Sequence, residues 1–339
     1  MTFDPDPRDA LALLSRCPPY RATQLRSLDG LARAHGLASL EAKDESVRMG
    51  LGSFKALGGV YAVADLVRQR ARTLGADDDP MGEAARRAAA DLTVCCASAG
   101  NHGLSVAAGA RVFGAQAVIY LADTVPEAFA ERLRSKGAAV VRAGEVYEDA
   151  MAQAMRDAKE RGWQLVSDSS WDGYRTIPST IMRGYCVMAH EMAGAFRERA
   201  QWPTHVFLQA GVGGLAAAVA AHIRAFWDRQ PRITIVEPDR APCLAQSVQA
   251  GEPTRADGPV SNMGRLDCKE PSLVAFEILR AAADDFVSVS DEEAQAAVAT
   301  LADHGIATTP SGVAGLAAAL KVEHLQEDRV LVIVSEGKE

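Results

Sequence analysis

Lys55 is the side chain best suited to covalent chemistry, because its surroundings favour a neutral amine. It lies in Gly-Ser-Phe-Lys-Ala-Leu-Gly-Gly, residues 52–59, where Ser53 is predicted to cap a helix running to about residue 67. Lys55 would then occupy the first helical turn, whose partial positive charge disfavours a second cation. A buried neutral lysine can attack a carbonyl and form a Schiff base. A solvated surface lysine is the alternative interpretation.

A second motif, Ser-Ala-Gly-Asn-His-Gly at residues 98–103, follows a strand-like run at 92–96 and precedes a predicted helix at 104–113. Ligands of open parallel sheets bind in the crevice at the carboxyl ends of the strands. Backbone N–H groups of such a turn can hold an anion, and Asn101 can hydrogen bond to a polar ring substituent. The alternative is an ordinary strand-to-helix turn.

A third motif, Gly-Val-Gly-Gly-Leu at residues 211–215, stands between a predicted strand at 205–209 and a helix reaching about residue 226. Its glycines let the backbone approach a phosphate closely at a helix N-terminus. The same stretch imitates the G-x-G-x-x-A dinucleotide fingerprint, with Glu237 after the next strand as the acid for a ribose. From the residues alone, both interpretations stay equally open.

Two further strand ends carry polar side chains. Asp168 and Asp172 follow strand-like residues 164–166, and either one can contact a ligand or cap a turn. Ser335 follows the strand-like run 330–334, where a hydroxyl can pair with a heteroaromatic nitrogen or simply close a terminal turn. Histidines, cysteines and acids show no metal-ligand spacing, so no metal site is expected.

The elements that must position these motifs alternate along the chain, which predicts an α/β fold with largely parallel sheets. Further strand-like runs stand at 117–121, 139–142 and 232–236. Further helix-like segments stand at 126–136, 147–161, 291–304 and 312–325. The segment from about 92 to 168 reads as a βαβαβαβ block that can close as one small domain.

Composition excludes several classes of protein. A length of 339 residues favours two domains, and 48% hydrophobic with 24% charged residues excludes a disordered or fibrous chain. A net charge of −8 argues against a nucleic-acid binder. No apolar run is long enough for a membrane span, and the acidic residues 1–6 do not resemble a signal peptide. Six cysteines without C-x-x-C spacing predict reduced thiols in the cytoplasm.

Taken together and in this order, these motifs resemble the fold-type II pyridoxal-phosphate enzymes, the tryptophan-synthase-β-like superfamily. The resemblance covers nearly the whole chain. Residues 53–55 resemble its cofactor-lysine motif, 98–103 its asparagine loop and 211–215 its phosphate-binding glycine loop. Ser335 matches the residue that faces the pyridine nitrogen, where a neutral partner moderates the electron sink and suits β-elimination.

Within the superfamily the sequence most resembles the diaminopropionate ammonia-lyase family. The matching stretches are residues 20–25, 43–51, 55–59, 170–174, 177–178, 181–185, 236–238 and 270–272. Threonine and serine dehydratases share fewer of them. Ala99 stands where that ammonia-lyase family typically carries Asp, which leaves the substrate's stereochemistry open. Thr309-Pro310 stands where the superfamily often has Glu before Ser311-Gly312.

The resemblance implies two open, largely parallel-sheet domains with pyridoxal 5'-phosphate in the cleft between them. Residues 1–92 and 169–339 would form the large cofactor-binding domain, and residues 93–168 a small mobile domain. The cofactor would be held as an imine on Lys55. Freed Lys55 would take the α-proton, and Asp168 would receive a β-ammonium group or protonate the leaving group. The product would hydrolyse to a 2-oxo acid and ammonia.

The resemblance also assigns each candidate residue a role. Catalysis is expected from Lys55 and Asp168. Cofactor binding is expected from Lys55, Asn101, Gly211, Val212, Gly213, Gly214, Leu215 and Ser335. Substrate binding is expected from Ser98, Ala99, Gly100, Asn101 and Asp168.

The expected function is a pyridoxal-phosphate-dependent ammonia-lyase that performs α,β-elimination on an L-β-substituted amino acid resembling 2,3-diaminopropionate. The alternatives are an L-threonine or L-serine dehydratase of the same superfamily, an NAD-dependent dehydrogenase, and a non-catalytic protein that binds the cofactor. The β-substituent stays open among amino, hydroxyl and larger groups. We expect a small amino-acid substrate, no nucleic-acid or membrane partner, a homodimer and a cytoplasmic location.

Overall fold

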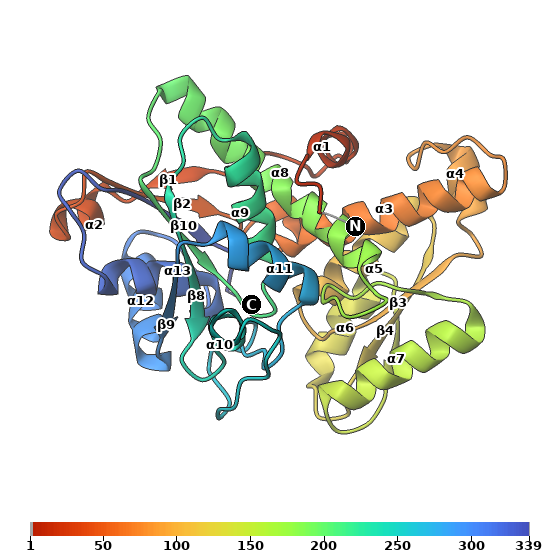
Figure 1. The fold of residues 1–339 in the computed structure, drawn as a ribbon. Coiled ribbons are helices and arrows are strands. Elements are labelled where there is room, and N and C mark those ends of the chain that lie inside the picture. Colours follow the sequence, from red (N-terminus) through yellow and green to blue (C-terminus); the bar gives the residue numbers. More distant parts are fainter. Residues whose placement is uncertain (1–2, 339) are drawn as a thin grey trace.

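Two sheets organise the chain in the computed structural model, which describes residues 3–338 (Figure 1). Residues 1, 2 and 339 lie outside the described residues. They belong to the predicted large domain, and residues 1 and 2 are part of the N-terminal stretch that was compared with a signal peptide. The α/β class with largely parallel sheets is confirmed. The division into a large domain and a mobile domain at 93–168 stays a prediction.

Within the described residues the larger sheet has six strands. Their order is β1 (Leu25–Ser27), β2 (Ser39–Asp44), β10 (Arg329–Val334), β7 (His205–Gln209), β8 (Arg232–Pro238) and β9 (Asp285–Val289). The smaller sheet has the order β5 (Ala139–Arg142), β4 (Gln116–Leu121), β3 (Thr93–Ala97) and β6 (Gln164–Leu165). The β1–β2 pair is antiparallel, and the other pairs are parallel.

The helices lie between and around these strands. They are α1 (Arg8–Leu14), α2 (Asp29–Ala34), α3 (Lys55–Thr73), α4 (Glu83–Ala88), α5 (Asn101–Phe113), α6 (Glu127–Ser135), α7 (Tyr147–Arg161), α8 (Thr176–Arg199), α9 (Gly214–Phe226), α10 (Cys243–Ala250), α11 (Leu273–Ala282), α12 (Asp291–Asp303) and α13 (Pro310–Lys321), with a 3₁₀ turn at Arg48–Gly50. No helix among the described residues is long and apolar enough to cross a membrane.

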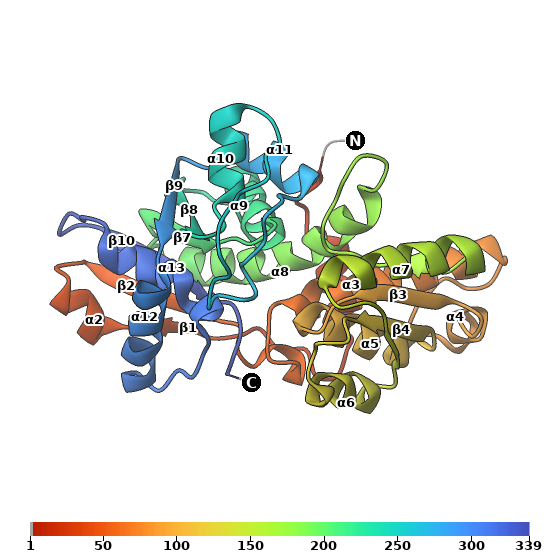
Figure 2. The ribbon, with the colours of Figure 1, turned by 90° about the horizontal axis from the view of Figure 1, so that it is seen from below.

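Both faces of the larger sheet are covered, as parallel sheets require. Along β10, Val330, Val332 and Val334 join the cluster that contains α12 and α13. Leu331 and Ile333 point the other way, into the cluster that contains α8, α9 and α11. Figure 2 shows the two groups of helices on either side of the strands. This period-2 alternation turns a continuous apolar run into a fully buried central strand.

The smaller sheet repeats this arrangement. Val94 and Cys96 of β3 pack toward α3 and α5, whereas Cys95 and Ala97 pack toward α7. Cys95 and Cys96 are core residues, since both are buried and burial raises the pKa of both thiols.

Close helix packing explains the glycines that follow Lys55. A Cβ on Gly58 would collide with the Tyr185 ring of α8, and a Cβ on Gly59 would collide with Ser105 of α5. Gly184 of α8 would in turn meet the backbone of Leu57. Helix α3 therefore lies directly against helices from both halves of the molecule. This contact fixes the direction in which the start of α3 points.

A buried ion network ties β2 to α8. Lys43 Nζ lies 2.6 Å from Glu191 Oε2, and both side chains are almost fully buried. Glu191 also accepts hydrogen bonds from the Arg48 guanidinium and, at 2.7 Å, from the Tyr20 hydroxyl. Arg48 is completely buried and pairs with Glu45 as well. Each charge in the network thus has an opposite charge, which buried ions require.

Several elements differ from the sequence expectation. The strands β1, β2 and β9 were not predicted, because none shows a long apolar run; β2 carries Glu41 and Lys43 among its six residues. The 24-residue helix α8 was also missed, and Pro178 lies in its first turn, where proline is tolerated. Helix α3 runs to Thr73 rather than residue 67, and α13 ends at Lys321 rather than 325.

Candidate active site

Lys55 is the first residue of α3, and the segment before it is tied to the chain that follows β10. Ser53 forms an antiparallel bridge with Glu336, and the Phe54 N–H donates to the Ser335 carbonyl at 3.1 Å. The Ser53 hydroxyl accepts a hydrogen bond from the Lys55 N–H at 3.1 Å, although Phe54 occupies the N-cap position itself. These contacts bring Lys55 and Ser335 together from opposite ends of the chain.

Lys55 and Asp168 form an ion pair in which Lys55 Nζ donates to Asp168 Oδ2, and each side chain is 23% exposed. Burial lowers the pKa of Lys55, but the charge of Asp168 and the nearby Tyr185 hydroxyl outweigh it and raise the pKa. Burial raises the pKa of Asp168, but the charge of Lys55 dominates and lowers it well below the usual range. The expectation that burial leaves Lys55 neutral is therefore wrong in this arrangement, because Asp168 stabilises the protonated amine.

Two aromatic rings form a wall beside the Lys55 amine. The rings of Phe54 and Tyr185 meet edge to face, 4.8 Å apart, and Lys55 Nζ lies 5.1 Å and 5.8 Å from their centroids. Tyr185 is buried, and among the described residues its hydroxyl has no hydrogen-bond partner. A buried unpaired hydroxyl is costly and is typical of a site that a ligand completes.

The asparagine loop connects β3 to α5, with Asn101 as the first helical residue. Asn101 Nδ2 donates to Glu336 Oε2 at 2.5 Å, which anchors the loop beside Ser335. Gly103 is required, because a Cβ there would collide with the Ser98 carbonyl. The loop therefore turns sharply into α5 and keeps its residues 98–101 at the edge where β3 ends.

The glycine loop connects β7 to α9, as predicted. Gly213 has φ +99°, a conformation that favours glycine, and its added Cβ would lie 2.9 Å from Ala275 Cβ. A Cβ on Gly211 would lie 3.0 Å from the Cys268 sulfur. A Cβ on Gly214 would lie 3.8 Å from the Asp168 carbonyl oxygen. The start of α9 thus lies next to Asp168, the partner of Lys55.

Glu237 decides between the two interpretations of the glycine loop. It is buried at the end of β8, and its carboxylate accepts hydrogen bonds from the N–H groups of Leu244 and Ala245, both at 2.8 Å. These contacts begin helix α10. The acid that would bind a ribose in a dinucleotide fingerprint is therefore occupied by the protein itself, which disfavours the dehydrogenase alternative.

Two residues of the site were missed by the sequence interpretation. Tyr147 begins α7, and its pKa is raised first by desolvation of its hydroxyl and then by the charge of Asp168. Cys268 has a pKa raised to about 11, by burial and again by the charge of Asp168. The charge of Asp168 thus acts on both groups, although Tyr147 is 53% exposed. Tyr147 follows β5 as Asp168 follows β6, so the shared carboxyl edge of a parallel sheet was the available signal.

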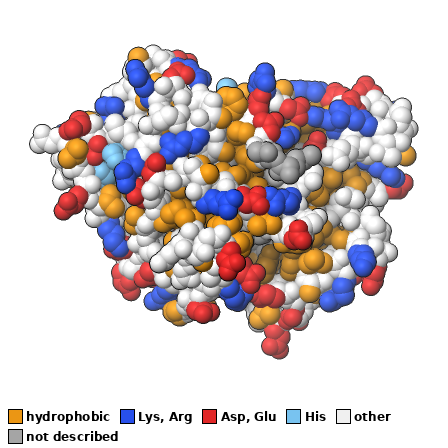
Figure 3. All heavy atoms as spheres, viewed as in Figure 1, with side chains coloured by type: hydrophobic (Ala, Val, Ile, Leu, Met, Phe, Trp, Pro, Cys, Tyr) orange, Lys and Arg blue, Asp and Glu red, His pale blue; other side chains and the backbone are white. Residues whose placement is uncertain are grey.

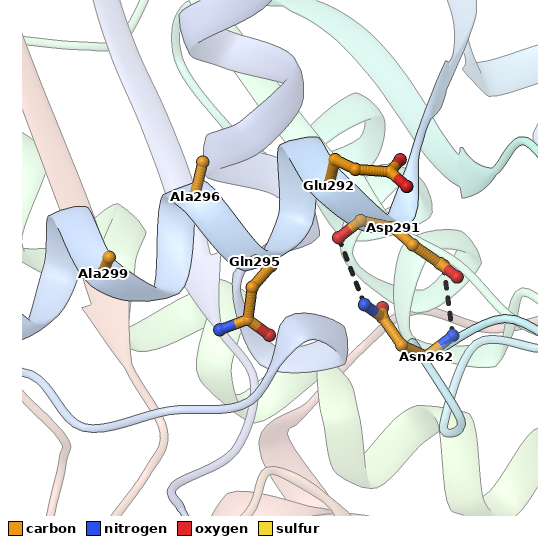
Figure 4. Close-up of a pocket in the computed structure, with 6 residues that line it drawn as sticks. All are labelled: Asn262, Asp291, Glu292, Gln295, Ala296 and Ala299. Carbon is orange, nitrogen blue, oxygen red and sulfur yellow. Dashed lines mark hydrogen bonds between the residues drawn. The ribbon is translucent and has the colours of Figure 1, made fainter.

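A separate surface hollow lies at the start of α12. Its lining residues are Asn262, Asp291, Glu292, Gln295, Ala296 and Ala299, and Asn262 is held by two hydrogen bonds to Asp291 (Figure 4). None of them belongs to the three predicted motifs. On the face shown in Figure 3, cationic and anionic side chains are interspersed rather than gathered by sign. No group of three or more metal-ligating side chains converges within residues 3–338.

Comparison with known proteins adds independent evidence to this geometry. The family described as "Pyridoxal-phosphate dependent enzyme" matches residues 17–336. The chain belongs to this family. Diaminopropionate ammonia-lyase of Escherichia coli (strain K12) is 33% identical over 93% of this chain and 84% of its own length.

Solved structures of related proteins support the same family assignment. Holo diaminopropionate ammonia-lyase from Escherichia coli superposes with a TM-score of 0.87 at 32% identity, covering 98% of this chain and 88% of that one. The same enzyme in complex with an aminoacrylate–PLP azomethine reaction intermediate gives a TM-score of 0.86 at 32% identity, with the same coverage. The chain is therefore a pyridoxal-phosphate-dependent carbon–nitrogen lyase of the ammonia-lyase type.

The residues at the site fit the pyridoxal phosphate of this family. The Lys55 side chain carries the primary amine that a cofactor aldehyde would need. Gly213, with φ +99°, lets the chain turn into the start of α9, and the N–H groups of such a helix N-terminus can bind a phosphate dianion. The unpaired Tyr185 hydroxyl is a polar group in the same enclosure. The structure thus brings together Lys55, Asp168, Asn101, Ser335 and the loop 211–215, although their individual roles remain proposals.

Proposed function

We propose that this enzyme removes the β-substituent of L-amino acids and releases a 2-oxo acid and ammonia. The observation that carries the proposal is a single base, Lys55, next to a loop in which Ala99 supplies no second one. Pyridoxal phosphate, when bound, withdraws the electron pair left at the α-carbon. For an amino β-substituent, the Cα–H and Cβ–N bonds break, and one water completes the conversion to one 2-oxo acid and two ammonia.

Lys55 is assigned the proton transfer at the α-carbon. Its amine is fixed by the first turn of α3 and by the aromatic wall of Phe54 and Tyr185, so it can reach the substrate from one side. Ala99 carries only a methyl group, which cannot hold a proton. An L-amino acid that presents its α-proton to Lys55 is therefore the expected substrate, and its D-isomer lacks a base on the opposite side.

Asp168 is assigned the recognition of the substrate's β-ammonium group. The Asp168 carboxylate pairs with the ammonium group of Lys55, and the same kind of pairing suits a β-ammonium group of the substrate. Of the two roles that the sequence left open, the electrostatics thus support the first. The nearby Lys55 amine shows that this carboxylate already accommodates an ammonium ion.

The remaining motifs are assigned binding roles. Residues 211–215 would hold the phosphate, and the loop from Ser98 to Asn101 the substrate carboxylate. Ser335 would face the pyridine nitrogen. Asn101 and Ser335 lie next to each other through Glu336, which supports placing both at one ring. Residues 93–168, whose strands form a separate sheet, would move as the small domain.

The proposal also covers the location of the protein in the cell and its oligomeric state. We propose a cytoplasmic location, supported by six cysteines that form no disulfide in the structure. We propose a homodimer on the family resemblance alone. Light scattering of the purified protein measures the second directly.

The ratio of catalytic efficiencies on L- and D-2,3-diaminopropionate tests the function. We expect the L-isomer to be favoured by about 10²–10⁴-fold, the usual contribution of a general base. Ala99→Asp should recover part of the D-activity. A ratio near one in the natural protein would show that another residue serves the second side. Absence of 2-oxo acid release from every β-substituted amino acid would reject the lyase assignment of the site.

A further inference from the structure

The carboxylate of Glu336 lies between the starts of two helices, and it is not among the residues assigned to catalysis or binding. Its side chain is only 6% exposed. Oε2 accepts a hydrogen bond from Asn101 Nδ2 and Oε1 accepts one from Thr309 Oγ1, both at 2.5 Å. Asn101 is the first residue of α5, and Thr309 is the N-cap of α13. One buried carboxylate thus connects a helix of the smaller sheet with a helix of the larger sheet.

The backbone of Glu336 is held from both sides. On one side, the Thr308 hydroxyl donates to the Glu336 carbonyl at 2.6 Å. On the other side, Glu336 pairs with Ser53 in the antiparallel bridge that leads to Lys55. Arg265 Nε lies 3.8 Å from Glu336 Oε2 and adds a positive charge beside the carboxylate. The position of this carboxylate is therefore fixed relative to the start of α3.

The contact with Glu336 selects one orientation of the Asn101 amide. An ionised carboxylate accepts hydrogen bonds and donates none, so the NH₂ group of Asn101 must face it and the amide carbonyl must turn away. A side-chain amide has two N–H donors, and Glu336 uses one of them. The second N–H is the donor that the proposed contact with a ring substituent of the cofactor needs.

Thr309 gives the carboxylate a firm support on the side of α13. Its hydroxyl oxygen accepts a hydrogen bond from the Gly312 N–H at 3.0 Å, and its hydroxyl hydrogen is donated to Glu336. Thr309 also stands where the superfamily often has Glu. In this protein a carboxylate is still present there, but it comes from the segment after β10.

We propose that Glu336 is a positioning residue for the cofactor: through the Asn101 amide, it holds the asparagine loop against the segment that carries Ser335. This inference rests on the cofactor contacts of the proposed function, in which Asn101 and Ser335 face one ring. Glu336 acts through Asn101 and not on the ring itself. Without Glu336, the amide can rotate and the loop loses its bond to the larger sheet. Cofactor binding then includes the cost of ordering the loop.

The test measures cofactor binding and needs no turnover. Pyridoxal 5'-phosphate is titrated into the apoproteins, and the absorbance of the bound cofactor gives the dissociation constant. Glu336→Ala should weaken binding by about 10–100-fold, the range for a hydrogen bond to a charged group. Asn101→Ala should weaken it at least as much. The double variant should bind as weakly as Asn101→Ala alone, because a residue that acts through Asn101 has no further effect once that side chain is removed.

Hydrogen exchange reports on the loop itself. In the apoprotein, Glu336→Ala should speed amide exchange in residues 98–103 by about 10-fold, whereas exchange in α9 should not change. Glu336→Gln should lie between Glu336→Ala and the natural protein. Its side chain can still accept from the Asn101 amide, but it can also donate to it, so it no longer selects a single orientation.

Glu237→Gln is the matched control. Glu237 is likewise buried at a strand end of the larger sheet, and its carboxylate also accepts two hydrogen bonds, both from the N–H groups of α10. This variant should keep the cofactor affinity and the exchange rate of residues 98–103. If Glu336→Ala does not fold, Glu336→Asp, whose carboxylate is one methylene shorter, replaces it in the same comparison and should lose affinity in the same direction.

Three outcomes would overturn the proposal. Additive losses in the double variant would show that Glu336 acts independently of Asn101. An unchanged cofactor affinity in the Glu336 variant would show that its contact with Asn101 does not matter for binding. An unchanged affinity in Asn101→Ala would remove the ring contact assigned to Asn101, and the role of Glu336 with it.

The same measurements separate this inference from the proposed function. The expected affinities without 2-oxo acid release from any substrate would keep the role of Glu336 and reject the proposed function. Release of 2-oxo acid together with additive losses would do the opposite.

Discussion

The lysine–carboxylate pairs Lys43–Glu191 and Lys55–Asp168 differ in how many other groups hold them. Lys43 pairs with Glu191, which also binds Arg48, and the two side chains of the pair are 2% and 7% exposed. Lys55 pairs with Asp168, and these side chains are 23% exposed. Further ion pairs hold the first pair, whereas the second pair is more exposed. Under the proposed function, the first pair stabilises the fold and the second takes part in the chemistry.

The largest expected effect comes from removing the reactive lysine. Lys55→Ala should lower elimination by more than about 10³-fold and abolish the absorbance of the lysine-bound cofactor, since both the amine and the base are lost. The free energy of unfolding of the apoprotein should change by no more than about 2 kcal/mol. Lys43→Ala is the matched control: its folded fraction should retain activity within a few-fold. Comparable turnover in both variants would remove the distinction between the pairs.

The next effect concerns stability. Glu191→Gln leaves Lys43 and Arg48 buried without their shared anion, so the free energy of unfolding should fall by about 3–5 kcal/mol. Asp168→Asn should cost clearly less, because the Lys55 side chain is 23% exposed and water can reach its amine. Urea denaturation of the two apoproteins measures both values. Equal losses would mean that the greater exposure of the second pair does not lower its contribution to stability.

The smallest effect involves a third buried carboxylate that has backbone N–H groups instead of a lysine. Burial raises the pKa of Glu237 to about 7, and the N–H groups of Leu244 and Ala245 offset only part of this. The folded protein therefore binds a proton more readily than the unfolded chain, whose Glu pKa is 4.5. The stabilisation is complete below pH 4.5 and is lost as the pH rises through about 7.

Glu237→Gln removes this titration. Relative to the variant, the natural protein should lose about 3 kcal/mol of unfolding free energy between pH 4.5 and pH 7, and little more above that. Urea denaturation of both proteins at pH 5, 6, 7 and 8 measures the difference. A difference that does not change with pH would show that Glu237 is ionised throughout this range, like the carboxylates paired with lysine.

Many strands and helices could be predicted from the local sequence pattern. The strands Ala139–Arg142 and His205–Gln209 and the helix Tyr147–Arg161 have the predicted bounds, because their apolar spacing and flanking glycines are local signals. Strand β2 could not be predicted, because its charged Lys43 belongs to a buried ion network. The other members of this network come from α8 and the turn before α3. Its burial depends on partners that no local window contains.

The sequence by itself determined the motifs, their order and the family: a lysine at a helix start and two loops at strand ends are set by short-range spacing. Only the tertiary structure decided that Asp168 stabilises the protonated amine of Lys55 and that Glu237 caps a helix. Residues close in sequence interact through fixed helix and strand periods. Residues distant in sequence meet only where the packing of whole helices and sheets brings them, and there the neighbouring charges set the protonation and the chemistry of each group.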